Sequence, residues 1–318
     1  MNIYFAPLEG IGGYIYRNAQ AEFFPKADKY FSPFLAPNQN RSFSSKEIRD
    51  IAPENNTTIS LVPQVMTNDA EIFVRAAKEL KNLGYEEVNL NLGCPSRTVV
   101  TKGRGAGFLA EPERLDRFLE QIFAGTELKI SLKTRIGIDA PEEFERLFEI
   151  YRKYSLEELI VHPRIQKDYY KNRPNMEVFS KIFPDAPYPV VYNGDIFSKK
   201  HFERFAKAYP SVDRVMLGRG VLADPCLFGE IRGQEELTKE KLREFHNRLF
   251  ADYTEELSGD RNVLFKMKEL WFYMAHVFTN HEKYAKKIRK TQRLSDYKEA
   301  VRSLFSEQEI QPGTFCGL

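Results

Sequence analysis

The chain has 318 residues, of which 42% are hydrophobic and 29% are charged, a balance that is typical of a folded globular protein and excludes a disordered one. A chain of this length buries enough surface to fold without disulfide bonds or structural metals. Its 47 Lys and Arg residues nearly balance 45 Asp and Glu residues, for a formal net charge of +2, which excludes a uniformly basic, histone-like protein.

Eight short apolar segments of strand length follow one another in the first two thirds of the chain. They are rich in Val, Ile, Leu and aromatic residues, and most end at Gly, Pro, Asn or a charged residue, which predicts buried β-strands. The predicted strands cover residues 3–8, 29–35, 58–66, 87–92, 128–134, 159–162, 189–192 and 214–217.

Segments with the apolar period of a helix lie between these strands. In the clearest, Asn68 or Asp69 can cap the first turn, Gly84 ends the helix, and one apolar face is formed by Ile72, Ala76, Leu80 and Leu83. Residues 113–123, 142–154 and 199–208 show the same pattern. Strands that alternate with helices predict a parallel sheet, and eight repeats predict an α/β protein with a (β/α)8 TIM barrel. A doubly wound open sheet is the alternative, although no Gly-x-Gly-x-x-Gly follows the first strand.

The last part of the chain has helical periodicity without a strand signal. Apolar residues recur at helical spacing within residues 242–257, 263–278, 284–288 and 297–304. We therefore predict two domains, a barrel domain over residues 1–237 and a small all-α helical domain over residues 238–318.

The predicted helical domain carries an uneven charge. Between Arg261 and Arg302 there are eleven basic and four acidic residues, a net charge of +7. Such a patch attracts a polyanion. The alternative is an ordinary solvated helix face.

Cysteine and histidine usage argues against a metal site. Cys94, Cys226 and Cys316 lie far apart without a Cys-x-x-Cys pair, and the five histidines show no His-x-x-x-His pair. We therefore expect no zinc site, no iron–sulfur cluster and no disulfide framework. No apolar run reaches membrane-span length and no secretory signal is visible, so the expected location is the cytoplasm.

The segments at the carboxyl ends of the predicted strands are candidates for a functional site, because enzymes with this barrel place their sites there. They contribute Pro7, Leu8, Glu9, Gln64, Asn91, Cys94, Lys133, Arg135, His162, Asn193, Gly194, Asp195, Gly218 and Arg219. Each alone fits an ordinary structural role. A barrel built only for stability, however, does not need polar groups at nearly every strand end.

The last two strand ends carry a phosphate-binding signal. Asn193-Gly194-Asp195 and Gly218-Arg219-Gly220 offer unobstructed backbone N–H groups and one guanidinium. Asp224-Pro225 is predicted to open a short helix, with Asp224 as the cap. Loops after the seventh and eighth strands, beside a small helix, form a phosphate cradle in many such barrels. Two ordinary glycine turns are the alternative.

One longer stretch combines a strand-end cysteine with a glycine-rich loop: Asn91-Leu-Gly-Cys-Pro-Ser-Arg-Thr-Val-Val-Thr-Lys-Gly-Arg-Gly-Ala-Gly107. Together with Ala6-Pro-Leu-Glu-Gly10, Lys133-Thr-Arg135, His162-Pro-Arg164 and Met216-Leu-Gly-Arg-Gly220, it resembles the tRNA-dihydrouridine synthases, a family of flavin-dependent enzymes. The resemblance covers the whole chain. Gly12-Gly13 departs from the family, which usually has a Thr-Asp pair there.

The resemblance implies reduction of the C5=C6 bond of uridine in tRNA, with FMN as the cofactor and NADPH as its reductant. It assigns Pro7, Leu8, Glu9, Gln64, Lys133 and His162 to the flavin. It assigns Asn193, Gly194, Asp195, Gly218 and Arg219 to the ribityl phosphate, and Asn91, Arg135 and Tyr170 to the uracil. The implied partners are tRNA and NADPH, with no membrane, metal or obligate protein partner.

The chemistry of the implied reaction gives Cys94 a role. Uracil C6 is the β-carbon of an enone, so a hydride from flavin N5 adds there and a proton must reach C5. A thiol with a pKa of about 8.5 is mostly protonated at neutral pH, so Cys94 can supply that proton. The uridine must leave its stack to reach the flavin.

Two other functions fit parts of the pattern. One is a flavin-dependent reductase of free pyrimidines, similar to dihydroorotate or dihydropyrimidine dehydrogenases, which would not need the basic helical patch. The other is an RNA-binding barrel with a dead site, against which Cys94, Lys133, His162 and Arg219 all argue.

Overall fold

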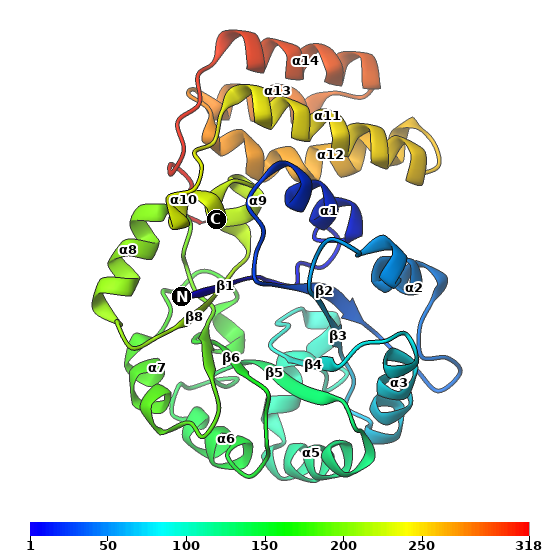
Figure 1. Ribbon diagram of the computed structural model, residues 1–318, viewed down its shortest axis with the longest axis vertical. Coiled ribbons are helices and arrows are strands. Elements are labelled where there is room, and N and C mark those ends of the chain that lie inside the picture. Colours follow the sequence, from blue (N-terminus) through cyan, green and yellow to red (C-terminus); the bar gives the residue numbers. More distant parts are fainter. Residues whose placement is uncertain (318) are drawn as a thin grey trace.

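The computed structural model describes residues 1–317 and consists of a closed barrel with a group of helices against one side (Figure 1). The parallel strands follow one another around the barrel in sequence order, and the last pairs with the first. They are β1 (Asn2–Phe5), β2 (Lys29–Leu35), β3 (Leu61–Val65), β4 (Glu87–Leu92), β5 (Lys129–Arg135), β6 (Leu159–His162), β7 (Val190–Tyr192) and β8 (Arg214–Leu217). The predicted (β/α)8 barrel is confirmed, and closure excludes the open sheet.

Helices cover the outside of the barrel (Figure 1). They are α1 (Tyr14–Phe23), α2 (Ser45–Ile51), α3 (Ala70–Asn82), α4 (Arg97–Val100), α5 (Pro112–Gly125), α6 (Glu143–Tyr151), α7 (Met176–Ile182), α8 (Lys199–Ala208), α9 (Arg219–Ala223) and α10 (Leu227–Arg232). In α3, Asp69 is the cap, and its Oδ1 accepts a hydrogen bond from Ile72 N at 3.1 Å. Gly84 follows this helix with a φ of +91°, a conformation that favours glycine.

The side chains inside the barrel indicate which residues lie at the carboxyl ends of the strands. A cluster separate from the main core fills the interior and comprises Tyr4, Ala6, Phe31, Val62, Ile160, Val191 and Met216. Side chains alternate between the two faces of a strand, so the residue two positions further on also points inward, nearer the carboxyl end. In β3 and β6 to β8 this rule gives Gln64, His162, Asn193 and Gly218. The alternation of side chains along the strands therefore brings these four residues to the carboxyl end of the barrel.

Helix α1 begins beside the site and is capped by a residue of another helix. Gly13 holds the N-cap position without a side chain to accept a hydrogen bond, and Asp50 Oδ1 accepts from Tyr14 N at 2.7 Å instead. A Cβ on Gly13 would lie 3.0 Å from that oxygen. Asp50 Oδ2 also pairs with the buried guanidinium of Arg17 at 3.1 Å. A carboxylate of α2 thus caps α1 directly after Gly12-Gly13.

A double-mutant cycle tests this cap. We expect Asp50→Ala to lower the free energy of unfolding by about 2–4 kcal/mol, because it removes a helix cap and the partner of a buried guanidinium. Gly13→Asp should destabilise the wild-type protein, because the new carboxylate crowds and repels Asp50. In the Asp50→Ala background the same change should raise the free energy of unfolding by about 1 kcal/mol, because it restores a cap. Urea unfolding of the four proteins measures the coupling, and additive effects would contradict the cap.

The connection after β8 differs from the prediction. Asp224 does not cap a helix that starts at Pro225, but lies at the carboxyl end of α9, and α10 begins three residues later, at Leu227. The reason is a local turn in which Asp224 Oδ1 accepts from Cys226 N at 2.9 Å. The short helix next to the phosphate signal is therefore α9, which starts at Arg219.

Four longer helices form the group outside the barrel (Figure 1). They are α11 (Lys239–Glu256), α12 (Asp260–Met274), α13 (His281–Lys290) and α14 (Leu294–Glu307), and a short 3₁₀ turn, η5 (Ala275–Val277), follows α12. The predicted all-α region is present, and α11 packs against α1 of the barrel. The domain division between residues 237 and 238 stays a prediction and falls just before α11. Within residues 1–317, none of the helices has the length and apolar character of a membrane span.

Candidate active site

The residues proposed from the sequence meet in two adjoining cavities at the carboxyl ends of the strands. The larger has a volume of about 350 Å³ and the smaller about 60 Å³. Every residue proposed above as a site residue lines one or both of them. Both cavities are lined by Pro7, Leu8, Lys133, His162, Tyr170 and Arg219. Glu9 is exposed at the rim of the larger cavity.

A chain of buried hydrogen bonds leads from the barrel interior to the larger cavity. Ser131 Oγ donates to Glu87 Oε1 at 2.6 Å, and Asn89 Nδ2 donates to Ser131 Oγ at 2.9 Å. Gln64 Nε2 donates to Asn89 Oδ1, and Asn91 Nδ2 donates to Gln64 Oε1, both at 2.7 Å. Because each amide donates on one side and accepts on the other, the orientation of all three is fixed.

This chain ends on the loop that holds Cys94. Asn91 Oδ1 accepts from the backbone N–H groups of Gly93 and Cys94, both at 3.0 Å. The loop is packed from behind by Gly105, where φ is +54° and a Cβ would lie 2.9 Å from Cys94 O, so only glycine fits. The thiol is half-buried, and burial raises its pKa above the ordinary value. It is therefore protonated at neutral pH and can donate a proton into the cavity.

Arg135 anchors two loops. Its Nε donates to Gly93 O at 3.0 Å, while Nη1 and Nη2 donate to Ile165 O at 2.9 Å and to Tyr169 O at 2.7 Å. Tyr169 has a φ of +49°, a backbone conformation that costs a non-glycine residue about 1–3 kcal/mol. The guanidinium thus ties the cysteine loop to the loop that presents Tyr170. The uracil contact predicted for Arg135 stays a prediction.

The amino group of Lys133 is buried without a counter-charge from a carboxylate of residues 1–317. It points into both cavities, and no carboxylate of the described residues is near enough to affect its pKa. Burial, together with the nearby charge of Arg135, lowers the pKa of Lys133 from 10.5 to about 7. An electron-rich or anionic group bound in the cavity would favour the charged form.

His162 is held in one tautomer by Arg164. Nη1 of Arg164 lies 2.9 Å from His162 Nε2, and a guanidinium can only donate, so Nε2 accepts and the ring proton is on Nδ1. Burial and the surrounding cations lower the pKa of His162 well below 6.5. The imidazole is therefore neutral, with an N–H on the side away from Arg164.

The smaller cavity is built as an anion cradle. Asp195 accepts from Arg164 Nη1 at 3.0 Å and Nη2 at 2.5 Å, and from Arg219 Nη2 at 3.1 Å. A carboxylate repels phosphate, so Asp195 serves to orient the two guanidiniums. Gly194 leaves no room for a side chain, since a Cβ would lie 2.0 Å from Tyr192 Oη. A phosphate group fits this donor set, with Arg219 as its cation.

Tyr170 lies between the two cavities. The guanidinium carbon of Arg219 is 4.4 Å from the centroid of the Tyr170 ring, and the His162 ring is 6.0 Å away. Tyr170 remains 46% exposed. The neighbouring Tyr169 does not line either cavity, so Tyr170 is the one of these two tyrosines that faces the site.

Several residues of the site were missed in the sequence. Phe34 lines the larger cavity from the end of β2, and the strand-end rule could have found it. Arg164 is part of the His162-Pro-Arg164 motif, but the sequence assigned it no role. Tyr273 comes from α12, more than 100 residues after the motifs of β4 and β5, and no local pattern connects them. Ile11 and Leu222 complete the apolar walls.

No cluster of three or more His, Cys, Asp or Glu side chains suited to a metal ion occurs among residues 1–317.

Comparisons with known proteins show the family of the chain. The family model described as dihydrouridine synthase (Dus) matches residues 5–312. A probable tRNA-dihydrouridine synthase 1 of Synechocystis sp. is 26% identical, covering 71% of this chain and 63% of that protein. The tRNA-dihydrouridine(16) synthase of Ralstonia nicotianae is 28% identical, covering 72% of each. The chain thus spans less than two thirds of the length of the first of these relatives.

Among solved structures, the old yellow enzyme homologue of Zymomonas mobilis superimposes with a TM-score of 0.54 and 13% identity, over 74% of this chain and 90% of that one. A likeness at this identity concerns the barrel fold.

Proposed function

The chain belongs to the dihydrouridine synthase family, and we propose that it reduces the C5=C6 bond of uridines in tRNA, in the cytoplasm, with FMN as cofactor and NADPH as reductant. One observation carries the proposal. The protonated thiol of Cys94 and the amino group of Lys133 face the same cavity, and a glycine–arginine cradle adjoins it.

The two cavities together suit FMN. The donor set of the smaller one, with Arg219 and the bare backbone at Gly194 and Gly218, would hold the ribityl phosphate. Lys133 and the Nδ1–H of His162 would face the isoalloxazine ring, where positive charge favours the anionic reduced form. When bound, the flavin supplies the hydride for uracil C6.

The residues of the chain do the remaining work. Cys94 holds a proton on its thiol and delivers it to uracil C5, and Asn91 fixes the loop that aims the thiol. Tyr170 and the walls of the cavity orient the extruded base and exclude water. Arg135 keeps the loops of Cys94 and Tyr170 at a fixed separation.

Exposed aromatic side chains near the mouth favour RNA over a free pyrimidine. Tyr169 and Tyr170 are 42% and 46% exposed, and on α12 Phe265 and Phe272 are 56% and 48% exposed. Phe272 adjoins Tyr273, which lines the cavity. Exposed rings of this kind stack on unpaired bases, whereas a free pyrimidine needs none.

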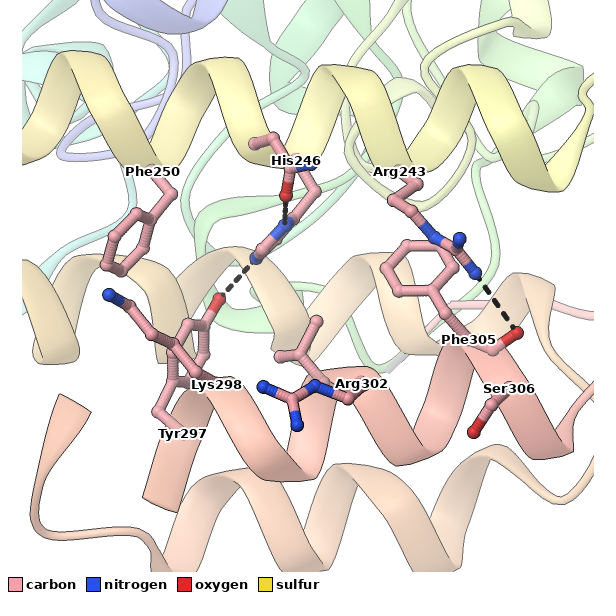
Figure 2. Close-up of a pocket in the computed structure, with 10 residues that line it drawn as sticks. Arg243, His246, Phe250, Tyr297, Lys298, Arg302, Phe305 and Ser306 are labelled. Atoms are coloured by element: carbon pink, nitrogen blue, oxygen red, sulfur yellow. Dashed lines mark hydrogen bonds between the residues drawn. The ribbon is translucent and has the colours of Figure 1, made fainter. Parts of the chain in front are cut away.

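A groove in the helical group supports the same partner. Figure 2 shows this cavity, of about 490 Å³, between α11 and α14. Its aromatic side chains are Phe250, Tyr297 and Phe305, and its cations are Arg243, Lys298 and Arg302. Lys298 Nζ lies 5.1 Å from the Phe250 ring centroid, and the Arg243 guanidinium lies 5.0 Å from that of Phe305. Tyr297 and Phe305 are buried, so the groove offers RNA its exposed cations, which would attract the phosphate backbone.

Removal of the exposed rings should weaken RNA binding without loss of stability. We expect Phe265→Ala combined with Phe272→Ala to raise the dissociation constant for tRNA about tenfold or more, since each stacked base contributes about 1–3 kcal/mol. Filter binding at fixed salt measures this dissociation constant. Ile48→Ala, at a residue that is 38% exposed on α2, is the matched control. Equal affinity of the double variant and the control would contradict the RNA contact.

A direct assay tests the function itself. The purified protein, supplied with FMN and NADPH, is incubated with unmodified tRNA transcripts or with uracil, and dihydrouridine is measured by mass spectrometry. Product in tRNA alone supports the proposal, whereas turnover of the free base alone indicates the free-pyrimidine reductase. A protein that binds tRNA but no flavin would be the dead RNA-binding barrel.

A further inference from the structure

The last described residues of the chain lie against the anion cradle. After α14, the chain runs back along the 3₁₀ turn η5, where Gln311 N donates to Val277 O at 2.6 Å and the Thr314 hydroxyl donates to His276 O. Ile310 forms an isolated antiparallel bridge with Phe278. This path fixes the direction of the following segment, residues 314–317.

Phe315 in this segment belongs to a small apolar cluster of its own. The cluster consists of Phe197, Ala223 and Phe315, with Tyr273 packed against it, and Phe315 is only 3% exposed. The rings of Phe315 and Phe197 meet edge to face with centroids 5.1 Å apart. Phe197 follows the Asn193-Gly194-Asp195 turn, and Ala223 ends α9, which begins at Arg219. The cluster therefore touches both loops of the cradle.

Arg219 is held between two rings. Its guanidinium carbon lies 5.1 Å from the Phe197 centroid and 4.4 Å from the Tyr170 centroid. Gly317 packs against Phe197. A Cβ at position 317 would lie 3.1 Å from the Phe197 ring and 4.0 Å from Arg219 Nη1. The orientation of Arg219 thus depends on Phe197, and Phe197 is supported by Phe315 and Gly317.

We propose that residues 314–317 position the cofactor phosphate site, with Phe315 as the positioning residue that acts through Phe197 on Arg219. The inference rests on the proposed function, because it takes the cradle as the site of the FMN phosphate. It adds that a segment beyond the helical group, far from every motif of the barrel, helps to set the affinity for that phosphate.

The comparison of FMN with riboflavin isolates the phosphate, because riboflavin has the same ring and ribityl chain but lacks that group. In the wild-type protein, fluorescence quenching should give tighter binding of FMN than of riboflavin. In Phe315→Ala, we expect the ratio of the two affinities to fall about tenfold, which is typical for loss of one charge-assisted hydrogen bond. Phe315→Leu keeps apolar bulk at this place and should retain most of the ratio.

Two variants separate this role from a general loss of stability. Phe118→Ala removes a phenylalanine that is 4% exposed on the far side of the barrel, and should leave the ratio unchanged at a similar loss of stability. If Phe315→Ala fails to fold, Gly317→Val tests the same contact from the tail, since its side chain would push the Phe197 ring aside.

The outcomes distinguish the two proposals. A lower ratio in Phe315→Ala or Gly317→Val supports the positioning role. An unchanged ratio, including equal loss of FMN and riboflavin affinity, overturns it and leaves the proposed function standing. A wild-type protein that binds neither flavin overturns the proposed function, and this inference with it.

Discussion

Cys94→Ala is expected to lower the rate of uridine reduction about 10²- to 10⁴-fold, the range typical for loss of a general acid. The thiol lies in the larger cavity, and burial keeps it protonated by raising its pKa. Alanine cannot donate a proton to C5, whereas the loop should keep its place because Asn91 binds the backbone of residue 94. Flavin content should therefore stay near that of the wild type.

Stopped-flow absorbance of the flavin separates the two half-reactions. Reduction of the variant by NADPH should proceed at the normal rate, and reoxidation by tRNA should be slow. Ile48→Ala, at an exposed residue of α2, is the control and should leave both rates unchanged. Normal reoxidation of the Cys94→Ala flavin by tRNA would show that another group supplies the proton.

Lys133→Met is expected to weaken FMN binding roughly 10- to 100-fold, because a hydrogen bond to a charged group contributes about 1.5–3 kcal/mol. Methionine keeps much of the length of the side chain and loses the ammonium. No carboxylate of the described chain would be left unpaired by this change. The loss should therefore report the contact with the cofactor, and equilibrium dialysis or fluorescence titration measures it.

The pH dependence of FMN affinity gives a second readout for Lys133. In the empty site its pKa is about 7, and a bound electron-rich ring should raise that pKa. The contribution to affinity is then fully present below pH 7 and is lost as the pH rises through the pKa of the complex. The wild-type affinity should fall above pH 7, and Lys133→Met should show a flatter profile. Parallel profiles would place Lys133 away from the cofactor.

The barrel, and the meeting of most proposed site residues at one end of it, could be predicted because both depend on local periodicity. The strands at 29–35, 87–92, 159–162 and 214–217 match the structure residue for residue. Once a parallel barrel is inferred, the alternation of side chains brings residues such as Gln64, Lys133 and His162 to one end without knowledge of any loop.

The remaining contacts join segments that no sequence period relates. The guanidinium of Arg135 binds three backbone carbonyls, and a carbonyl leaves no mark in the sequence. The cap of α1 comes from Asp50, 37 positions after Gly13, and depends on how two helices pack. Tyr273 and Phe315 reach the site only through the docking of the helical group.

The chain of amides from Glu87 to Asn91 has a fixed sense, so no member can turn over unless its neighbours turn as well. The loop of Cys94, the proposed proton donor, is consequently attached through Asn91 to a continuous set of hydrogen bonds inside the barrel. Tyr170 and the rings of α12 stand outside this chain. Under the proposed function, changes in the choice of uridine can therefore arise in those outer parts without a shift of the Cys94 thiol.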